Sequence, residues 1–211
     1  MKSLPRKSLT RRQAMAGLAG ALSLAVAGRI RWLNANDEGL EVIEHPMGEW
    51  VDLDGAFSDV SSENTKGYYL RVSDAQIMSY NQYVETYATD GSTVREGFDV
   101  PSLAVLTVDI KNDGHEGDGG LNLFEMYLVP VRMNEYLIED ADLFLLGETK
   151  LRESGSNGWK VGIKEGTEYQ VHLPFIHNTS TPECYERQMN DTEFLYYVSN
   201  LPVRHAIRAS V

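Results

Sequence analysis

Residues 104–112 read AVLTVDIKN and contain the clearest alternation of side chains in this chain. Successive side chains of a β-strand point to opposite faces, so a period of two predicts one buried face and one outer face. The residues expected in the core are Ala104, Leu106, Val108 and Ile110. The residues expected on the other face are Val105, Thr107, Asp109 and Lys111.

Further strand-like segments lie on both sides of this stretch and are separated by turn residues. They are residues 40–45, 50–53, 68–72, 124–131, 169–175 and 194–198, with shorter β-like runs at 143–146 and 159–163. One helix is indicated over residues 80–87, because Ser79 and Gln82 have the spacing of a capping box. The apolar face of that helix is rich in tyrosine, and we expect it to pack against the sheet rather than to bind sugars or peptides.

Short alternating strands with one brief helix predict a mainly β fold, an antiparallel immunoglobulin-like β-sandwich, preceded by an N-terminal hydrophobic signal or anchor helix. Three segments resemble the telokin-like immunoglobulin sandwiches of exported Gram-positive bacterial proteins. They are residues 104–112, which end in Asn112 before a Gly/Asp loop, residues 124–136 and residues 164–175. The resemblance implies an uncharacterised, actinobacterial-type family of exported or anchored proteins, and it carries no active residues to this chain.

The N-terminal residues have the layout of an export signal. Five basic residues precede the apolar run 14–27, and the motif Thr10-Arg11-Arg12 resembles a twin-arginine signal. The small residues at 25–27 suit cleavage, whereas Arg29, Arg31 and Trp32 suit a retained anchor, so both alternatives stay open. We expect residues 1–31 to be a signal peptide or membrane anchor, 32–47 a linker and first strand, and 48–211 the sandwich domain.

The charge of the chain excludes one class of partner. The net charge is −12, and removing residues 1–27 leaves 14 basic and 31 acidic residues, a net charge of −17. Nucleic-acid binding requires positive charge to displace counterions from phosphates, so we expect no nucleic-acid partner. We expect contact with the membrane only through the N-terminal segment.

The loop after residue 111 contains the strongest candidates for a binding site. Its candidate binding residues are Asn112, Asp113, His115, Glu116 and Asp118. Calcium prefers several oxygen ligands from one flexible loop, which makes Asp109, Asp113, Glu116 and Asp118 the candidate metal ligands. The spacing is not that of an EF-hand, and glycine and aspartate are also what a tight β-connection requires.

A zinc site is disfavoured by the positions of its candidate ligands. They are His172, His177, Glu183 and Cys184. Zinc needs three or four converging donors, whereas His172 is expected on the outer face of its strand and the loop to Cys184 is unconstrained. We expect Cys184, the only cysteine, to be buried and inert, with pairing between chains as the alternative.

No pattern in the sequence indicates a catalytic nucleophile. The sequence therefore predicts an exported cell-surface or secreted module that is not an enzyme and that binds an unknown protein or cell-surface ligand. The loops at residues 112–120 and 178–190 are its candidate contact surfaces. The alternatives are an exported hydrolase that uses paired carboxylates and a calcium-stabilised structural module.

Overall fold

The computed structural model describes residues 41–58, 63–89, 91–115, 120–132, 135–148, 161–177 and 182–211. The chain divides into two units, Met1–Leu40 and Glu41–Val211, and every described residue belongs to the second. The predicted signal or anchor at residues 1–31 therefore lies outside the described residues. Within the described residues, no helix has the length and apolar character needed to cross a membrane.

The described part of the chain forms one nine-stranded sheet with the order β1-β9-β8-β5-β6-β7-β4-β3-β2. The strands are β1 (Val42–Pro46), β2 (Val51–Asp52), β3 (Tyr68–Ser79), β4 (Pro101–Asn112), β5 (Tyr127–Pro130), β6 (Leu137–Glu139), β7 (Thr167–His177), β8 (Glu193–Ser199) and β9 (Arg204–Ser210). All neighbouring strands are antiparallel except β1 and β9, which are parallel. The prediction of a mainly β fold is confirmed, whereas the strands form one sheet instead of the two separate sheets of a sandwich.

This sheet is barrel-like because the segment from β1 to β2 joins its two ends. β1 pairs with β9, and two residues after β1 the amide of Gly48 donates to the Val72 carbonyl oxygen of β3 over 2.8 Å. Beyond β2, the amide of Phe57 donates to the Leu201 carbonyl oxygen over 2.7 Å. Joining the ends of a sheet satisfies backbone groups that an open edge leaves unpaired.

The inner face of the sheet forms the main hydrophobic core. The predicted core set of β4 is confirmed, since Ala104, Leu106, Val108 and Ile110 are all at most 1% exposed. Alternate residues of β3, β7 and β8 complete this core, as predicted. They are Tyr68, Leu70, Val72, Val171, Leu173, Phe175, Phe194, Tyr196 and Val198.

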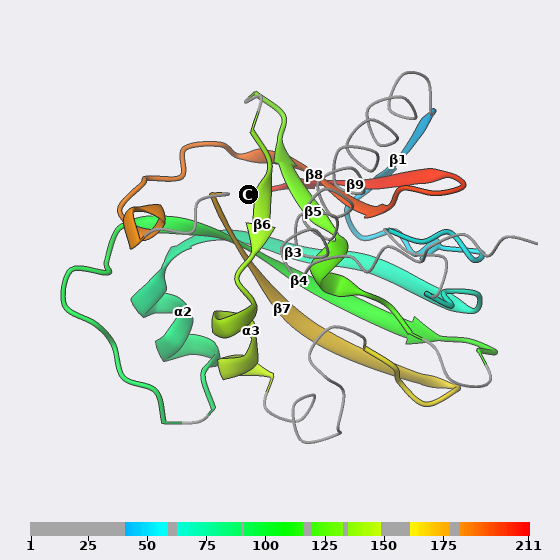
Figure 1. Ribbon diagram of the computed structural model, residues 1–211, viewed down its shortest axis with the longest axis horizontal. Helices are drawn as coiled ribbons and strands as arrows, with labels where there is room; N and C mark the ends of the chain where they lie inside the picture. Colours follow the sequence, from blue (N-terminus) through cyan, green and yellow to red (C-terminus); the bar gives the residue numbers. More distant parts are fainter. Residues whose placement is uncertain are drawn as a thin grey trace, which may run out of the picture. The chain divides into compact units, whose positions relative to one another are not determined.

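Two α-helices form a second apolar cluster on the outer face at one end of β4. They are α2 (Tyr80–Tyr87) and α3 (Ala141–Gly147), and two 3-10 turns, η1 (Leu123–Glu125) and η2 (Pro182–Tyr185), complete the helical elements described. Figure 1 shows α2 and α3 side by side on the left, next to β4 and β7. Tyr83 and Val84 of α2 share this cluster with Leu103 and Val105 of β4. The tyrosine face of α2 therefore packs against the sheet, as predicted.

The capping box that predicted α2 is present. The Ser79 hydroxyl accepts from the Gln82 amide over 3.1 Å, and the Gln82 side chain accepts from the Ser79 amide over 2.8 Å. These two bonds satisfy amides that the first turn of a helix leaves without partners. The helix runs from Tyr80 to Tyr87, the range that the sequence predicted.

The structure differs from the sequence analysis in three other segments. Residues 143–146 belong to helix α3, because the Asp140 side chain accepts from the Leu143 amide and caps a helix there. A short apolar run has no periodicity that separates a buried strand from a buried helix. Residues 124–131 begin within η1 and are extended only in β5. Strand β9 was not predicted; its residues in the main core are Ile207 and Ala209.

We predict that Ser79→Ala lowers the free energy of unfolding by about 1 kcal/mol, because the Gln82 amide loses its buried acceptor. Urea denaturation followed by circular dichroism measures this change. Gln82→Glu is the matched control, since glutamate keeps the reciprocal bond to the Ser79 amide. Equal stability of Ser79→Ala and the wild type would show that the capping box does not stabilise this helix.

Candidate functional site

Asn112, the last residue of β4, fixes the start of the predicted binding loop. Its side chain is buried, its Oδ1 accepts from the His115 amide over 2.9 Å, and its Nδ2 donates to the Ile163 carbonyl oxygen over 2.8 Å. These bonds close a turn over residues 113–114 and tie it to a distant segment. The side chain of Asn112 is thus occupied by the fold, and it shapes the loop rather than facing a ligand.

His115 packs the same loop against the turn that precedes β3. Its Nδ1 lies 2.9 Å from the Lys66 carbonyl oxygen, and its ring centroid lies 5.0 Å from that of Tyr68. The two backbones approach so closely at Gly67 that an added Cβ would lie 2.8 Å from the His115 nitrogen. Gly67 also has a φ of +83°, which favours glycine. The turn and the loop therefore form one rigid wall.

A cavity of about 450 Å³ opens beside this wall, at the end of the sheet where β2 ends, β3 begins and β4 ends. The described residues that line it are Asp52, Asp54, Asn64, Lys66, Gly67, Tyr69, Asp113, Gly114 and His115. Three of them carry carboxylates and one is a lysine. The cavity is thus polar, and its acidic groups come from two separate loops.

The carboxylates of the cavity differ in their partners. Asp113 pairs with the Lys111 ammonium over 2.8 Å, and this hydrogen bond raises the pKa of Lys111. Asp52 accepts from the Asp54 amide over 2.9 Å, and its negative charge raises the pKa of the Tyr69 hydroxyl. Lys111 therefore stays charged and Tyr69 stays neutral at neutral pH. Lys111 balances Asp113, which leaves the carboxylates of Asp52 and Asp54 as the acidic side of the cavity.

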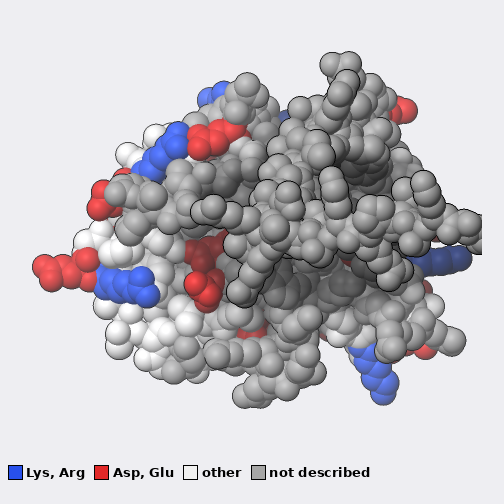
Figure 2. Space-filling model, in the orientation of Figure 1, with Lys and Arg blue, Asp and Glu red and all other residues white. Residues whose placement is uncertain are grey.

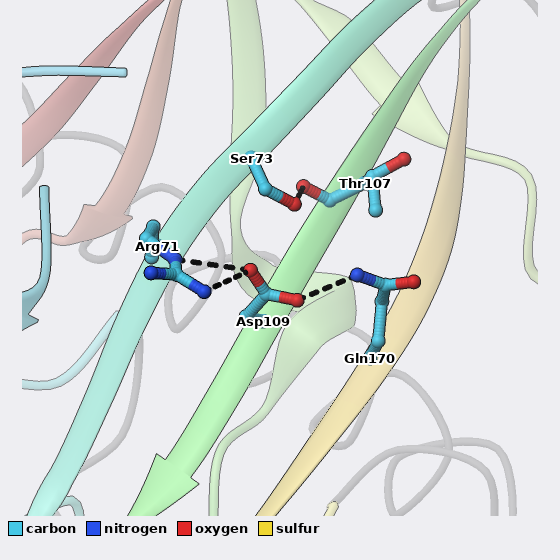
Figure 3. Close-up of polar contacts among 5 residues, drawn as sticks. All are labelled: Arg71, Ser73, Thr107, Asp109 and Gln170. Carbon is cyan, nitrogen blue, oxygen red and sulfur yellow. Dashed lines mark hydrogen bonds and ion pairs between the residues drawn. The ribbon is translucent and has the colours of Figure 1, made fainter. Parts of the chain in front are cut away.

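Asp109 lies outside this cavity, in a polar row on the outer face of the sheet (Figure 3). It faces Arg71 of β3 and Gln170 of β7 in the strand register. Its Oδ2 accepts from the Arg71 guanidinium over 2.9 Å and 3.0 Å, and its Oδ1 accepts from the Gln170 amide over 2.7 Å. Both oxygens of Asp109 are thus engaged by neighbouring strands, and the Trp50 ring covers the guanidinium at 4.4 Å.

The calcium hypothesis stays a prediction. Glu116 and Asp118 lie outside the described residues, and Asp113 is exposed and paired with Lys111. In the part of the chain that the structure describes, no three histidine, cysteine or acidic side chains are placed to hold a metal ion. Of the four candidate ligands, the described ones, Asp109 and Asp113, lie in different surroundings.

The candidate zinc ligands occupy separate surroundings. The His172 ring stacks on Tyr87 at 4.1 Å, next to α2. His177 is 2% exposed, and its Nδ1 lies 3.8 Å from a Glu135 carboxylate oxygen. Cys184 is buried in the apolar cluster around the helices, as predicted, and nothing is described of the Glu183 side chain.

A buried carboxyl group, Glu139 of β6, was not singled out by the sequence. It is 8% exposed, and neither carboxyl oxygen has a hydrogen-bond partner among the residues that the structure describes. Burial, and then the charge of Asp140, raise its pKa well above the ordinary value of 4.5. The neighbouring Asp140 caps α3 and accepts from the Tyr185 hydroxyl. This adjacent acidic pair therefore belongs to the core and to a helix cap, away from the cavity.

The sequence did not identify most of the residues that line the cavity. Asp113 and His115 were predicted as binding residues, whereas Asp52, Asp54, Lys66 and Tyr69 were not. The turn at residues 54–55 and the strand opening at residue 67 carried local signals. No local signal shows that these turns meet the loop after β4.

The family of the chain follows from a comparison of its sequence. The family model described as Domain of unknown function (DUF5028) matches residues 42–205. The chain belongs to this family. The DUF5028 match runs from the start of β1 to the start of β9, so the domain includes every residue that lines the cavity. Neither the curated proteins nor the solved structures include a match to this chain.

We predict that Asn112→Ala lowers the free energy of unfolding by about 2–3 kcal/mol, because buried backbone groups at residues 115 and 163 lose their partners. Urea denaturation measures the change. Asp113→Asn is the matched control, since it removes only an exposed ion pair and should cost less than about 1 kcal/mol. A smaller loss for Asn112→Ala than for the control would contradict a structural role for this asparagine.

We predict that Glu139→Gln removes a pH-dependent loss of stability. A carboxyl group with a raised folded-state pKa stabilises the fold while it is protonated, so the wild type should lose stability as the pH rises above about 4.5. The loss amounts to at most about 1.4 kcal/mol for each pH unit up to the folded-state pKa. Urea denaturation at pH 5 and pH 8 tests this, with Glu85→Gln on the exposed side of α2 as control. Parallel curves for the wild type and Glu139→Gln would contradict the prediction.

Proposed function

We propose that this domain is an exported, non-catalytic binding module whose ligand site is the cavity at the end of β2, β3 and β4. The cavity of about 450 Å³ carries this proposal, because it places side chains from three segments around one hollow. Ligand sites occur where a rigid scaffold holds loops close together. The wall made by residues 66–67 and 115 supplies such a scaffold.

The ligand of this site, as we propose it, presents a cationic group, such as the ammonium or guanidinium of a protein or cell-surface molecule. Asp52 and Asp54 accept hydrogen bonds from such a group, and charge-assisted bonds are the stronger kind. Lys66 faces the same cavity and favours ligands that also carry an acceptor or a negative charge. The net charge of −17 after residue 27 attracts cations over longer distances.

On the face drawn in Figure 2, acidic and basic side chains are interspersed over the described surface. Mixed signs on a surface suit solubility. The net charge of −17 after residue 27 disfavours a nucleic-acid partner.

Export belongs to the same proposal. The basic leader, the apolar run at residues 14–27 and the twin-arginine resemblance support a location at the cell surface or outside the cell. The N-terminal segment then serves either as a cleaved signal or as an anchor that holds the binding module at the membrane.

A calcium-stabilised module is the second candidate function, because the loop after Asn112 is rich in acidic residues.

We predict that oligolysine binds the wild type, and that the double variant Asp52→Asn/Asp54→Asn binds it at least about tenfold more weakly. Isothermal titration calorimetry at low and at physiological salt measures the affinity. Asparagine keeps the acceptor that the Asp54 amide uses, so the turn should stay folded.

The control is Glu85→Gln/Glu96→Gln, which makes the same change in net charge on exposed residues of another region. An equal loss in both double variants would show a general charge effect and contradict the proposed site. Melting curves with calcium and with a chelator test the second candidate, and identical melting temperatures would dismiss it.

A further inference from the structure

The first strand of the domain, β1, is held mainly by a short parallel ladder. Its five residues pair with β9 from Val42 opposite Arg204 to Pro46 opposite Arg208. Parallel pairing is slightly weaker per residue than antiparallel pairing. On one face of β1, the Glu44 carboxylate accepts from the Arg208 guanidinium over 2.7 Å and 3.2 Å, and both side chains are exposed. An exposed ion pair contributes little to stability.

Two histidines join the strands on the other face of β1. The Nε2 of His45 lies 2.9 Å from the Nδ1 of His205, and their rings stack with centroids 5.2 Å apart. In this hydrogen bond one ring donates and the other accepts, so at least one ring is neutral. Two imidazolium rings have no acceptor between them and repel each other. The contact therefore depends on the protonation state of the pair.

The described strands near the pair carry several charged side chains, and one of them, Asp52, acts on His205. Asp52 of β2 favours protonation of His205, whereas the guanidinium of Arg204 on the same strand lies over the Tyr197 ring at 6.0 Å. From β8, the Ser199 hydroxyl accepts from the His205 amide, and Glu193 pairs at the far end of β9 with Ser210. Glu41 is exposed just before β1, and Arg71 of β3 is bound to Asp109.

Burial lowers the pKa of His205, the neighbouring His45 lowers it further, and Asp52 opposes both. A histidine with a lowered folded-state pKa contributes stability that is complete above its unfolded value of 6.5 and is lost as the pH falls. Acid therefore weakens the contact, and neutral pH restores it. The lost stability is local, because it concerns the pairing of β1 with β9.

We propose that the His45–His205 pair is a proton-operated latch that holds β1 on β9 at neutral pH and releases it on acidification. Release detaches β1 from β9 and so opens the junction between the two ends of the sheet. Gly48, two residues after β1, bonds to Val72 of β3 and is the other side of this junction. Release also exposes the paired edge of β9. The domain thus has a built-in response to an acidic surrounding, and Asp52 links it to the binding cavity because this carboxylate lines the cavity and acts on His205.

Hydrogen exchange of the full chain, followed by mass spectrometry at pH 7.5, 6.5 and 5.5, tests the latch. After correction for intrinsic exchange, opening of residues 42–46 should rise below about pH 6.5 by up to about tenfold per pH unit. His205→Asn removes the titrating ring and should abolish this rise. His172→Asn is the matched control, since His172 is also half-buried with a lowered pKa but lies on β7. It should leave the rise unchanged.

An equal rise in His205→Asn, or no rise in the wild type, would overturn the latch. If His205→Asn fails to fold, ring NMR of the wild type decides the question. The His205 signal should then titrate together with loss of protection in β1. Titration of His205 with β1 still protected would overturn the proposal. So would faster opening of β1 at pH 7.5 on adding a chelator, because this would identify a metal clip.

Discussion

The structure depends on how one long sheet buries its inner face. β3, β4 and β7 supply the longest ladder, and their inward side chains form a single core with those of β8 and β9. A curled sheet must still bring its ends together, and the short segment from β1 to β2 does this by pairing with β9 and then bonding to β3. Five residue pairs join β1 to β9, and single backbone bonds from Gly48 and Phe57 continue this junction toward β3 and the segment after β8.

The outer face of the same strands is divided into two regions of different chemistry. Near α2 and α3, Leu103 and Val105 of β4 are covered by helix side chains. Four residues after Val105 on β4, Asp109 bonds to Arg71 of β3 and to Gln170 of β7 (Figure 3). Every second residue of a strand points to the outer face. These outward residues are apolar where helices pack on the sheet and polar at the Asp109 end. The helix-covered end is packed, and the uncovered end leads to the cavity.

The cavity is a product of closely packed turns rather than of a recognisable motif. Gly67 lets the turn before β3 lie against His115, while Asn112 holds the loop after β4 in place. The carboxylates of Asp52 and Asp54 line the hollow beside this wall. This arrangement supports recognition of a cationic group, and it differs from the calcium loop that the sequence suggested. Asp109, a candidate ligand by sequence, is engaged elsewhere.

By itself, the sequence determined the local structure: the alternation at residues 104–112 fixed a strand and its core face, and Ser79 with Gln82 fixed a helix from Tyr80 to Tyr87. These features depend on neighbours within a few residues, which a periodic pattern records. Only the tertiary structure decided that nine strands form one curled sheet, that residues 143–146 are helical, and that the turn at residues 54–55 meets the loop at residues 113–115. The order of the strands and the contacts between distant turns arise from long-range packing of the core, and no short stretch of sequence specifies that packing.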